Sequence, residues 1–125
     1  MKILLDTSVL IDVLRGRPDR KAELANLVRA GHRLMTTAVN VAEIYAGMRV
    51  AEAPRTEEFL SGLECLELKL TDARLAGRMK HKWSEKGRTL TLADTMIAAI
   101  ALENGCHLFT DNRRDFPMPE LQLYR

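Results

Sequence analysis

Five short apolar runs of strand length are separated by longer segments with helical periodicity. The runs are 2–5, 33–37, 65–70, 107–110 and 121–124, and the sequence predicts helices over 7–16, 19–32, 40–52, 56–63, 71–87 and 91–105. Strands that alternate with helices are typical of a parallel sheet, because parallel neighbours need a crossover connection. The pattern therefore predicts an α/β fold with helices on both faces of the sheet.

Composition limits the classes of protein that this chain can represent. With 125 residues, of which 46% are apolar, we expect a single domain over 1–125 with a sizeable core. No apolar stretch approaches the length of a membrane span, and Asp6 and Asp12 interrupt the first apolar run before it resembles a secretory signal. Cys65 and Cys106 stand alone, which is typical of buried thiols in a reducing cytoplasm. The net charge of +2 is too small to indicate nucleic-acid binding by itself.

Acidic residues lie where several of the predicted strands and helices join. Asp6 ends the first run, Glu43 lies in the helix after the second, Asp94 opens the helix before the fourth, and Asp111 and Asp115 follow the fourth. Ligands of open α/β sheets bind beyond the carboxyl ends of the strands. We therefore expect acids from four separate segments to converge at one edge of the sheet.

Each acid also has a purely structural interpretation. Asp6 could cap the first helix, and the pairs Asn40 to Glu43 and Thr91 to Asp94 both have the spacing of a capping box. However, apolar residues follow both Glu43 and Asp94, and crowded buried carboxylates repel one another unless a cation joins them. A site made only of oxygen ligands favours Mg²⁺ or Mn²⁺.

Four motifs carry a resemblance to a known family. The stretches "LLDTSVLI", "VAEIYAG", "LADTMIAAIA" and "LFTDNRRDF" occur in this order. The sequence resembles PIN-domain ribonucleases over its whole length, and specifically the VapC toxins of bacterial toxin–antitoxin pairs. The resemblance implies a three-layer α/β/α sandwich whose parallel sheet has about five strands in the order 3-2-1-4-5.

The resemblance also implies the residues of the site. Asp6, Glu43 and Asp94 match the family's acidic metal ligands. Many PIN domains have Thr, any residue and Asp after the fourth strand, whereas here Asn112 takes the place of that Asp. VapC-like proteins with Asn there usually carry an acid three residues later, so we prefer Asp115 over Asp111 as the fourth acid. Residues expected to surround the ligands or to hold a metal-bound water are Ser8, Thr110, Asn112 and Asp111.

The chemistry implied by the resemblance is metal-dependent hydrolysis of RNA phosphodiester bonds, leaving 5′-phosphate and 3′-hydroxyl ends. A divalent ion held by Asp6 and Asp94 would lower the pKa of a bound water and stabilise charge on the phosphate. Arg113 and Arg114 are candidate phosphate contacts, because they lie within the fourth motif.

The same resemblance implies partners for this protein. It implies a VapB-like antitoxin, a homodimer and an RNA substrate that could be transfer, ribosomal or messenger RNA. Two other functions are also compatible with the sequence. The alternatives are a PIN-like binding module without catalysis, and a metal phosphohydrolase or DNA nuclease of related fold.

Overall fold

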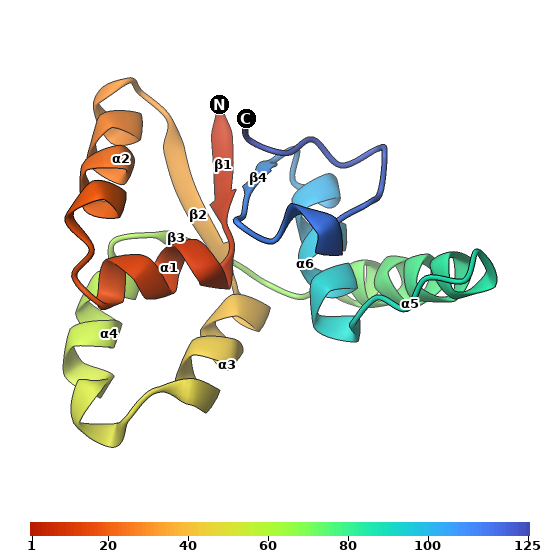
Figure 1. The fold of residues 1–125 in the computed structure, drawn as a ribbon, viewed down its shortest axis with the longest axis horizontal. Coiled ribbons are helices and arrows are strands. Elements are labelled where there is room, and N and C mark those ends of the chain that lie inside the picture. Colours follow the sequence, from red (N-terminus) through yellow and green to blue (C-terminus); the bar gives the residue numbers. More distant parts are fainter.

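Four parallel strands form one sheet in the order β3-β2-β1-β4. The structure is a computed structural model that describes residues 1–125. The strands are β1 (Lys2–Leu5), β2 (Arg33–Thr37), β3 (Glu64–Leu66) and β4 (His107–Phe109). In the central register, Leu4 of β1 lies opposite Met35 of β2 and Leu108 of β4 (Figure 1). The predicted parallel sheet and its strand order are confirmed.

The predicted fifth strand is reduced to a single bridge. Leu123 pairs in parallel with Leu108, through hydrogen bonds from the Leu108 N–H to the Gln122 carbonyl (2.9 Å) and from the Tyr124 N–H to the Leu108 carbonyl (2.7 Å). Because β4 has only three residues, it offers few partners for a longer strand. β3 is also shorter than the predicted 65–70. Lys69 instead caps the following helix, and its N–H donates to Asp72 at 2.9 Å.

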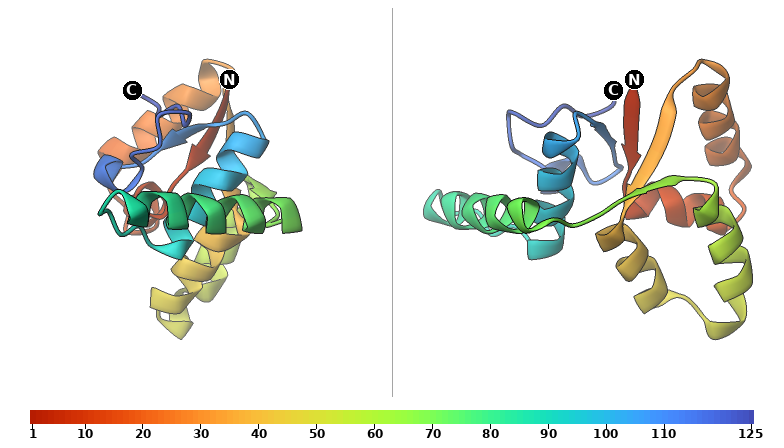
Figure 2. Two further views of the ribbon diagram at one scale, coloured as in Figure 1. Left: turned by 90° about the vertical axis from the view of Figure 1, so that its right-hand side faces the viewer. Right: turned by 180° about the vertical axis from the view of Figure 1, so that it is seen from behind.

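The helices form two outer layers and one cap. α1, α2 and α4 cover one face of the sheet, α6 covers the other with α5 packed on its outer side, and α3 lies beyond the carboxyl end of β2 (Figures 1 and 2). Two short 3-10 helices, η1 and η2, complete the fold. The bounds are α1 Thr7–Leu14, α2 Pro18–Arg29, α3 Ala38–Gly47, η1 Val50–Glu52, α4 Ala53–Ser61, α5 Leu70–Glu85, α6 Leu92–Glu103 and η2 Arg113–Asp115.

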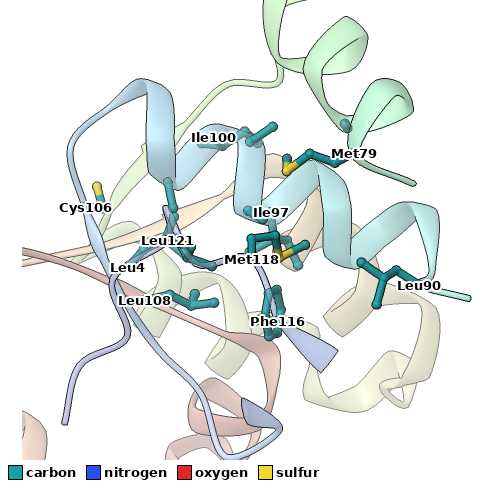
Figure 3. Close-up of a cluster of buried hydrophobic side chains, with 14 of the residues drawn as sticks. Leu4, Met79, Leu90, Ile97, Ile100, Cys106, Leu108, Phe116, Met118 and Leu121 are labelled. Carbon is teal, nitrogen blue, oxygen red and sulfur yellow. The ribbon is translucent and has the colours of Figure 1, made fainter. Parts of the chain in front are cut away.

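The alternation of side chains along β1 divides the core in two. Leu4 belongs to the cluster beneath α5 and α6, whereas Ile3 and Leu5 belong to the cluster beneath α1 and α2. α6 is the most buried helix, as its apolar sequence predicts, and residues 97–101 are fully buried. The C-terminal segment completes the first cluster, where Phe116, Met118 and Leu121 pack around α6 and β4 (Figure 3).

Several helix ends differ from the sequence-based expectation. The helix predicted over 40–52 begins at Ala38 and ends at Gly47, and α4 begins at Ala53 rather than at 56. Pro54 occupies the first turn of α4, where its missing N–H costs no hydrogen bond. Gly16 ends α1 with a φ of +77°, a conformation that favours glycine. None of the helices combines the length and the apolar character needed to cross a membrane.

Candidate functional site

Asp6 is the most deeply placed acid of the site. It follows β1 directly, its side chain is buried, and its N–H donates to the Phe109 carbonyl of β4 at 2.9 Å. The hydroxyl of Thr110 donates to one carboxylate oxygen at 2.7 Å, and the side-chain amide of Asn40 donates to the other at 3.2 Å. β2 and β4, the two neighbours of β1, therefore each lead into a residue that fixes the Asp6 carboxylate.

Asn40 is the site residue that the sequence reasoning missed. The prediction that Asn40 caps the helix is wrong, because Thr37 is the cap and accepts a hydrogen bond from the Asn40 N–H at 3.1 Å. Thr37 also donates to the Asn40 side-chain oxygen at 2.7 Å, which turns the amide towards β1. There it donates to Asp6 and, at 3.0 Å, to the Thr7 hydroxyl. The sequence signal that could have indicated this role was the presence of two possible helix-capping residues, Thr37 and Asn40, three positions apart.

A relay of hydrogen bonds connects Asp6 with Glu43. Thr7 accepts from Asn40 and donates its hydroxyl proton to a Glu43 carboxylate oxygen at 2.7 Å. Glu43 is exposed on α3, so this bond orients a side chain that has little packing around it. We call the series Thr37, Asn40, Thr7 and Glu43 the Asn40 relay. It connects the acid that follows β1 with an acid on α3.

Asp94 lies in the first turn of α6. The Thr91 hydroxyl caps this helix and accepts from the Asp94 N–H at 3.1 Å. Burial raises the pKa of Asp94 to about 6, the Thr91 hydrogen bond opposes that rise, and the charges of Asp6, Asp115 and Glu43 add to it. Burial also raises the pKa of Asp6, against the hydrogen bonds from Thr110, Thr7 and Asn40 and together with the charge of Asp115. The four acids therefore act on one another electrostatically.

The two acids that follow β4 have different surroundings. Asp115 ends η2, and its charge acts on both Asp6 and Asp94. Asp111 instead pairs with Arg20 of α2 at 2.6 Å, and its N–H donates to the Ser8 hydroxyl at 3.2 Å. Asn112 lies between them, and its N–H donates to the Thr110 hydroxyl at 2.9 Å.

The side chains of Arg113 and Arg114 differ in their hydrogen-bond partners. Arg113 donates to the backbone carbonyls of Tyr124 and Arg125, at the C-terminal segment. Arg114 is exposed and forms no ion pair, while its carbonyl accepts from the Arg88 guanidinium. Asp12, the other acid near the amino terminus, pairs with Arg17 at 3.4 Å and with Arg20 at 3.1 Å.

The chemistry of the acids fits a divalent cation. The donors are all carboxylate oxygens, and a cation would offset the repulsion and burial that raise the pKa of Asp94. As the side chains stand, no three His, Cys, Asp or Glu residues form a set that could hold one metal ion. Glu43 and Asp115 are exposed, so their side chains lie outside the packed core.

A groove adjoins the acids on the side of α1, α3 and α4. It has a volume of about 540 Å³, and Glu43 lies on its wall together with Ile11, Leu14 and Ile44. Of the apolar residues on α3 and beyond it, Ile44 is buried and Met48 is half-buried, whereas Tyr45 and Val50 are exposed. The groove thus combines an apolar wall with charged residues of both signs, since Arg15, Arg49 and Glu52 also line it.

Comparisons with known proteins give one family. The family model of the PIN domain matches residues 3–118. Ribonuclease VapC19 of Mycobacterium tuberculosis is 33% identical over 120 residues, which cover 95% of this chain and 96% of that protein. Ribonuclease VapC2 of Haemophilus influenzae is 31% identical over 121 residues, which cover 93% of this chain and 90% of that protein.

Solved structures of the same family share the fold. In the crystal structure of DNA-bound VapBC from Salmonella typhimurium, one chain matches with a TM-score of 0.85 and 26% identity, over 99% of this chain and 97% of that chain. VapBC2 from Rickettsia felis, bound to a promoter DNA fragment, matches with a TM-score of 0.87 at 22% identity, over 99% of this chain and 98% of that one. The second likeness concerns the fold alone.

Proposed function

The chain belongs to the PIN-domain family and, within it, to the VapC ribonucleases of toxin–antitoxin pairs, and from that premise we propose that its acids bind a divalent metal ion to hydrolyse RNA. Asp6 and Asp94 are the proposed principal ligands, and Glu43 and Asp115 complete the set. The observation that carries this proposal is the arrangement of the acids: Thr110 and Asn40 hold the buried Asp6 carboxylate, and the Asn40 relay joins it to Glu43. We propose Mg²⁺ or Mn²⁺ as the ion, because the donors are all oxygens.

Within this mechanism the protein's own residues position the reacting groups. A bound divalent ion supplies an activated water and neutralises charge on the phosphate. Thr110 and Asn40 hold the Asp6 carboxylate in one orientation, and Thr7 holds Glu43. Such supporting hydrogen bonds commonly fix the ligands of a metal site. Arg114 is the stronger candidate for a phosphate contact, since Arg113 is engaged by the C-terminal carbonyls.

We propose Asp115 rather than Asp111 as the fourth acid. The Arg20 guanidinium holds Asp111 towards α2, whereas the charge of Asp115 acts on Asp6 and Asp94. Ser8 and Asn112 support the loop between them by the hydrogen bonds described above. Asp111 is therefore a suitable control for Asp115, because the two acids lie in the same loop.

The direct experiment compares RNA cleavage by the wild type, Asp94→Asn, Asp115→Asn and Asp111→Asn. Total cellular RNA is incubated with each purified protein with and without Mg²⁺, and new 5′ ends are mapped. We expect new 5′-phosphate ends from the wild type and from Asp111→Asn, and a loss of at least about a hundredfold in rate for the other two. Equal cleavage by all four proteins, or cleavage of single-stranded DNA in preference to RNA, would contradict the proposal.

The partners follow from the family and from the groove beside Glu43. We propose that a VapB-like antitoxin places an amphipathic helix in this groove and a basic side chain next to the acids, since Ile11, Leu14, Ile44 and Met48 form an apolar wall beside Glu43. We also propose a homodimer through the exposed apolar residues Tyr45 of α3 and Val50 of η1. Finally, we propose a cytoplasmic location, because a ribonuclease of this kind acts on cellular RNA.

A further inference from the structure

Exposed cations at every fourth position follow one side of α5. They are Arg74, Arg78 and Lys82, with Lys86 at the C-cap, and we call them the α5 cation row. The buried residues of the helix are Asp72, Ala76 and Met79, and the last two join the core cluster with α6. Arg74 and Arg78 lie on the side of the helix opposite Ala76. Because residues four apart advance by about 40° round a helix, Lys82 and Lys86 lie progressively closer to the buried side. At 1.5 Å per residue the row extends over about 18 Å.

No carboxylate neutralises this row. None of its four members forms an ion pair, and Glu85, the one exposed acid of α5, lies 3.8 Å from His81. Like charges four residues apart destabilise a helix. The helix dipole favours cations in the last turn, which accounts for Lys82 and Lys86. It does not account for Arg74 and Arg78, which lie in the first two-thirds of the helix.

The segment after α5 leads back to the acids. Arg88, two residues beyond Lys86, donates from its guanidinium to the carbonyl of Arg114 in η2, the short helix that ends with Asp115. α5 itself extends away from the sheet on the outer side of α6 (Figures 1 and 2). The chain then returns to α6, whose first turn carries Asp94. The row therefore extends along α5 from a neighbouring cation, Arg88, that contacts the segment of the acids.

We propose that the α5 cation row binds the phosphates of the RNA strand that extends from the cleavage site. This inference rests on the proposed ribonuclease function, because a polyanion must reach acids that would otherwise repel it. The row supplies charge at regular spacing and without base-reading groups, so it orients the strand rather than selecting a sequence. Trp83 takes no part, since it is half-buried and Lys86 stacks on its ring at 4.6 Å.

The test measures RNA binding as a function of salt. The variant Arg74→Gln/Arg78→Gln removes two charges of the row, and Gln is a good helix former. The control Lys21→Gln/Arg29→Gln removes two exposed charges from α2, on the other face of the sheet (Figure 1). Each pair is placed in the Asp94→Asn background, and binding of fluorescein-labelled oligouridine of about 20 nucleotides is followed by anisotropy. Circular dichroism verifies that α5 is retained.

We expect the α5 variant to lower the salt slope of log K by about 1.4, because each contact to single-stranded RNA contributes about 0.7. Its affinity at low salt should fall on the order of tenfold, while the α2 control should bind as tightly as the Asp94→Asn parent protein. With Asp94 restored, the α5 variant should raise KM for long RNA and leave cleavage of a tetranucleotide unchanged.

An unchanged salt slope, or an equal change in the α2 control, would overturn the role of the row. These outcomes are separable from failure of the ribonuclease proposal, since binding is measured without cleavage. If the wild type cleaves RNA but the slope does not change, only the row is refuted. If the slope changes but the wild type cleaves nothing, the row stands as an RNA-binding surface and the ribonuclease proposal is refuted.

Discussion

Replacing Asp94 by Asn should stabilise the metal-free protein at neutral pH. The folded protein raises the pKa of Asp94 from 3.8 to about 6, so the folded state binds the proton more tightly than the unfolded chain. Between these two pKa values stability falls as pH rises, and above pH 6 the full penalty remains. Two pKa units correspond to about 3 kcal/mol. Because Asp94 is half-exposed, solvent screening reduces this to about 1 kcal/mol.

The assay compares urea unfolding of the wild type and Asp94→Asn in EDTA and in Mg²⁺. In EDTA at about pH 7, the variant should be more stable by about 1 kcal/mol, and the difference should disappear near pH 4. A ligand at 100 times its dissociation constant stabilises the folded state by about 2.7 kcal/mol. Saturating Mg²⁺ should therefore stabilise the wild type but not the variant, so that the order of stability reverses.

Two results would refute this reasoning. If Asp94→Asn is less stable than the wild type in EDTA at neutral pH, burial and the neighbouring acids do not destabilise the ionised form of Asp94. If Mg²⁺ stabilises both proteins equally, Asp94 is not a ligand. Asp111→Asn is the matched control: it should keep the wild-type response to Mg²⁺, because Asp111 pairs with Arg20 instead.

Three further experiments test the supporting structure. Asn40→Ala removes a donor from the buried Asp6 carboxylate and should cost about 1–3 kcal/mol in urea unfolding, with slower RNA cleavage; unchanged stability and rate would contradict the Asn40 relay. A double-mutant cycle of Arg20→Met and Asp111→Asn should give a coupling of up to about 1 kcal/mol, and additive effects would show that the ion pair holds nothing in place. Met118→Ala, at a site with 2% exposure, should cost about 2–5 kcal/mol, and a small loss would mean that the C-terminal segment is not part of the core.

The architecture was largely predictable because β1, β2, β4 and α6 carry strong local patterns. Their apolar runs have the length of buried strands or of a buried helix, and the turns between them are short. The weak points were the elements whose ends depend on distant partners. The run 65–70 alternates like a strand, yet most of it is exposed, and Lys69 caps α5. The run 121–124 has only the short β4 to pair with.

For the site, sequence reasoning named the acids and Thr110, but it missed Asn40, the other group that orients Asp6. The acids Asp6 and Asp94 stand next to a predicted strand or helix end, so their convergence follows from the topology. The role of Asn40 depends on β2 lying next to β1, which no local pattern contains. Likewise, the direction of Asp111 depends on Arg20, 91 residues earlier in the chain.

The bond between Thr110 and Asp6 joins residues 104 positions apart, across the last strand of the sheet to be synthesised. β4, Asp115 and the core residues Phe116, Met118 and Leu121 all lie C-terminal to α6. Asp6 therefore receives the Thr110 hydrogen bond only after β4 has paired with β1. A contact of this sequence separation makes the orientation of Asp6 depend on completion of the whole sheet and not on the first strand and helix alone.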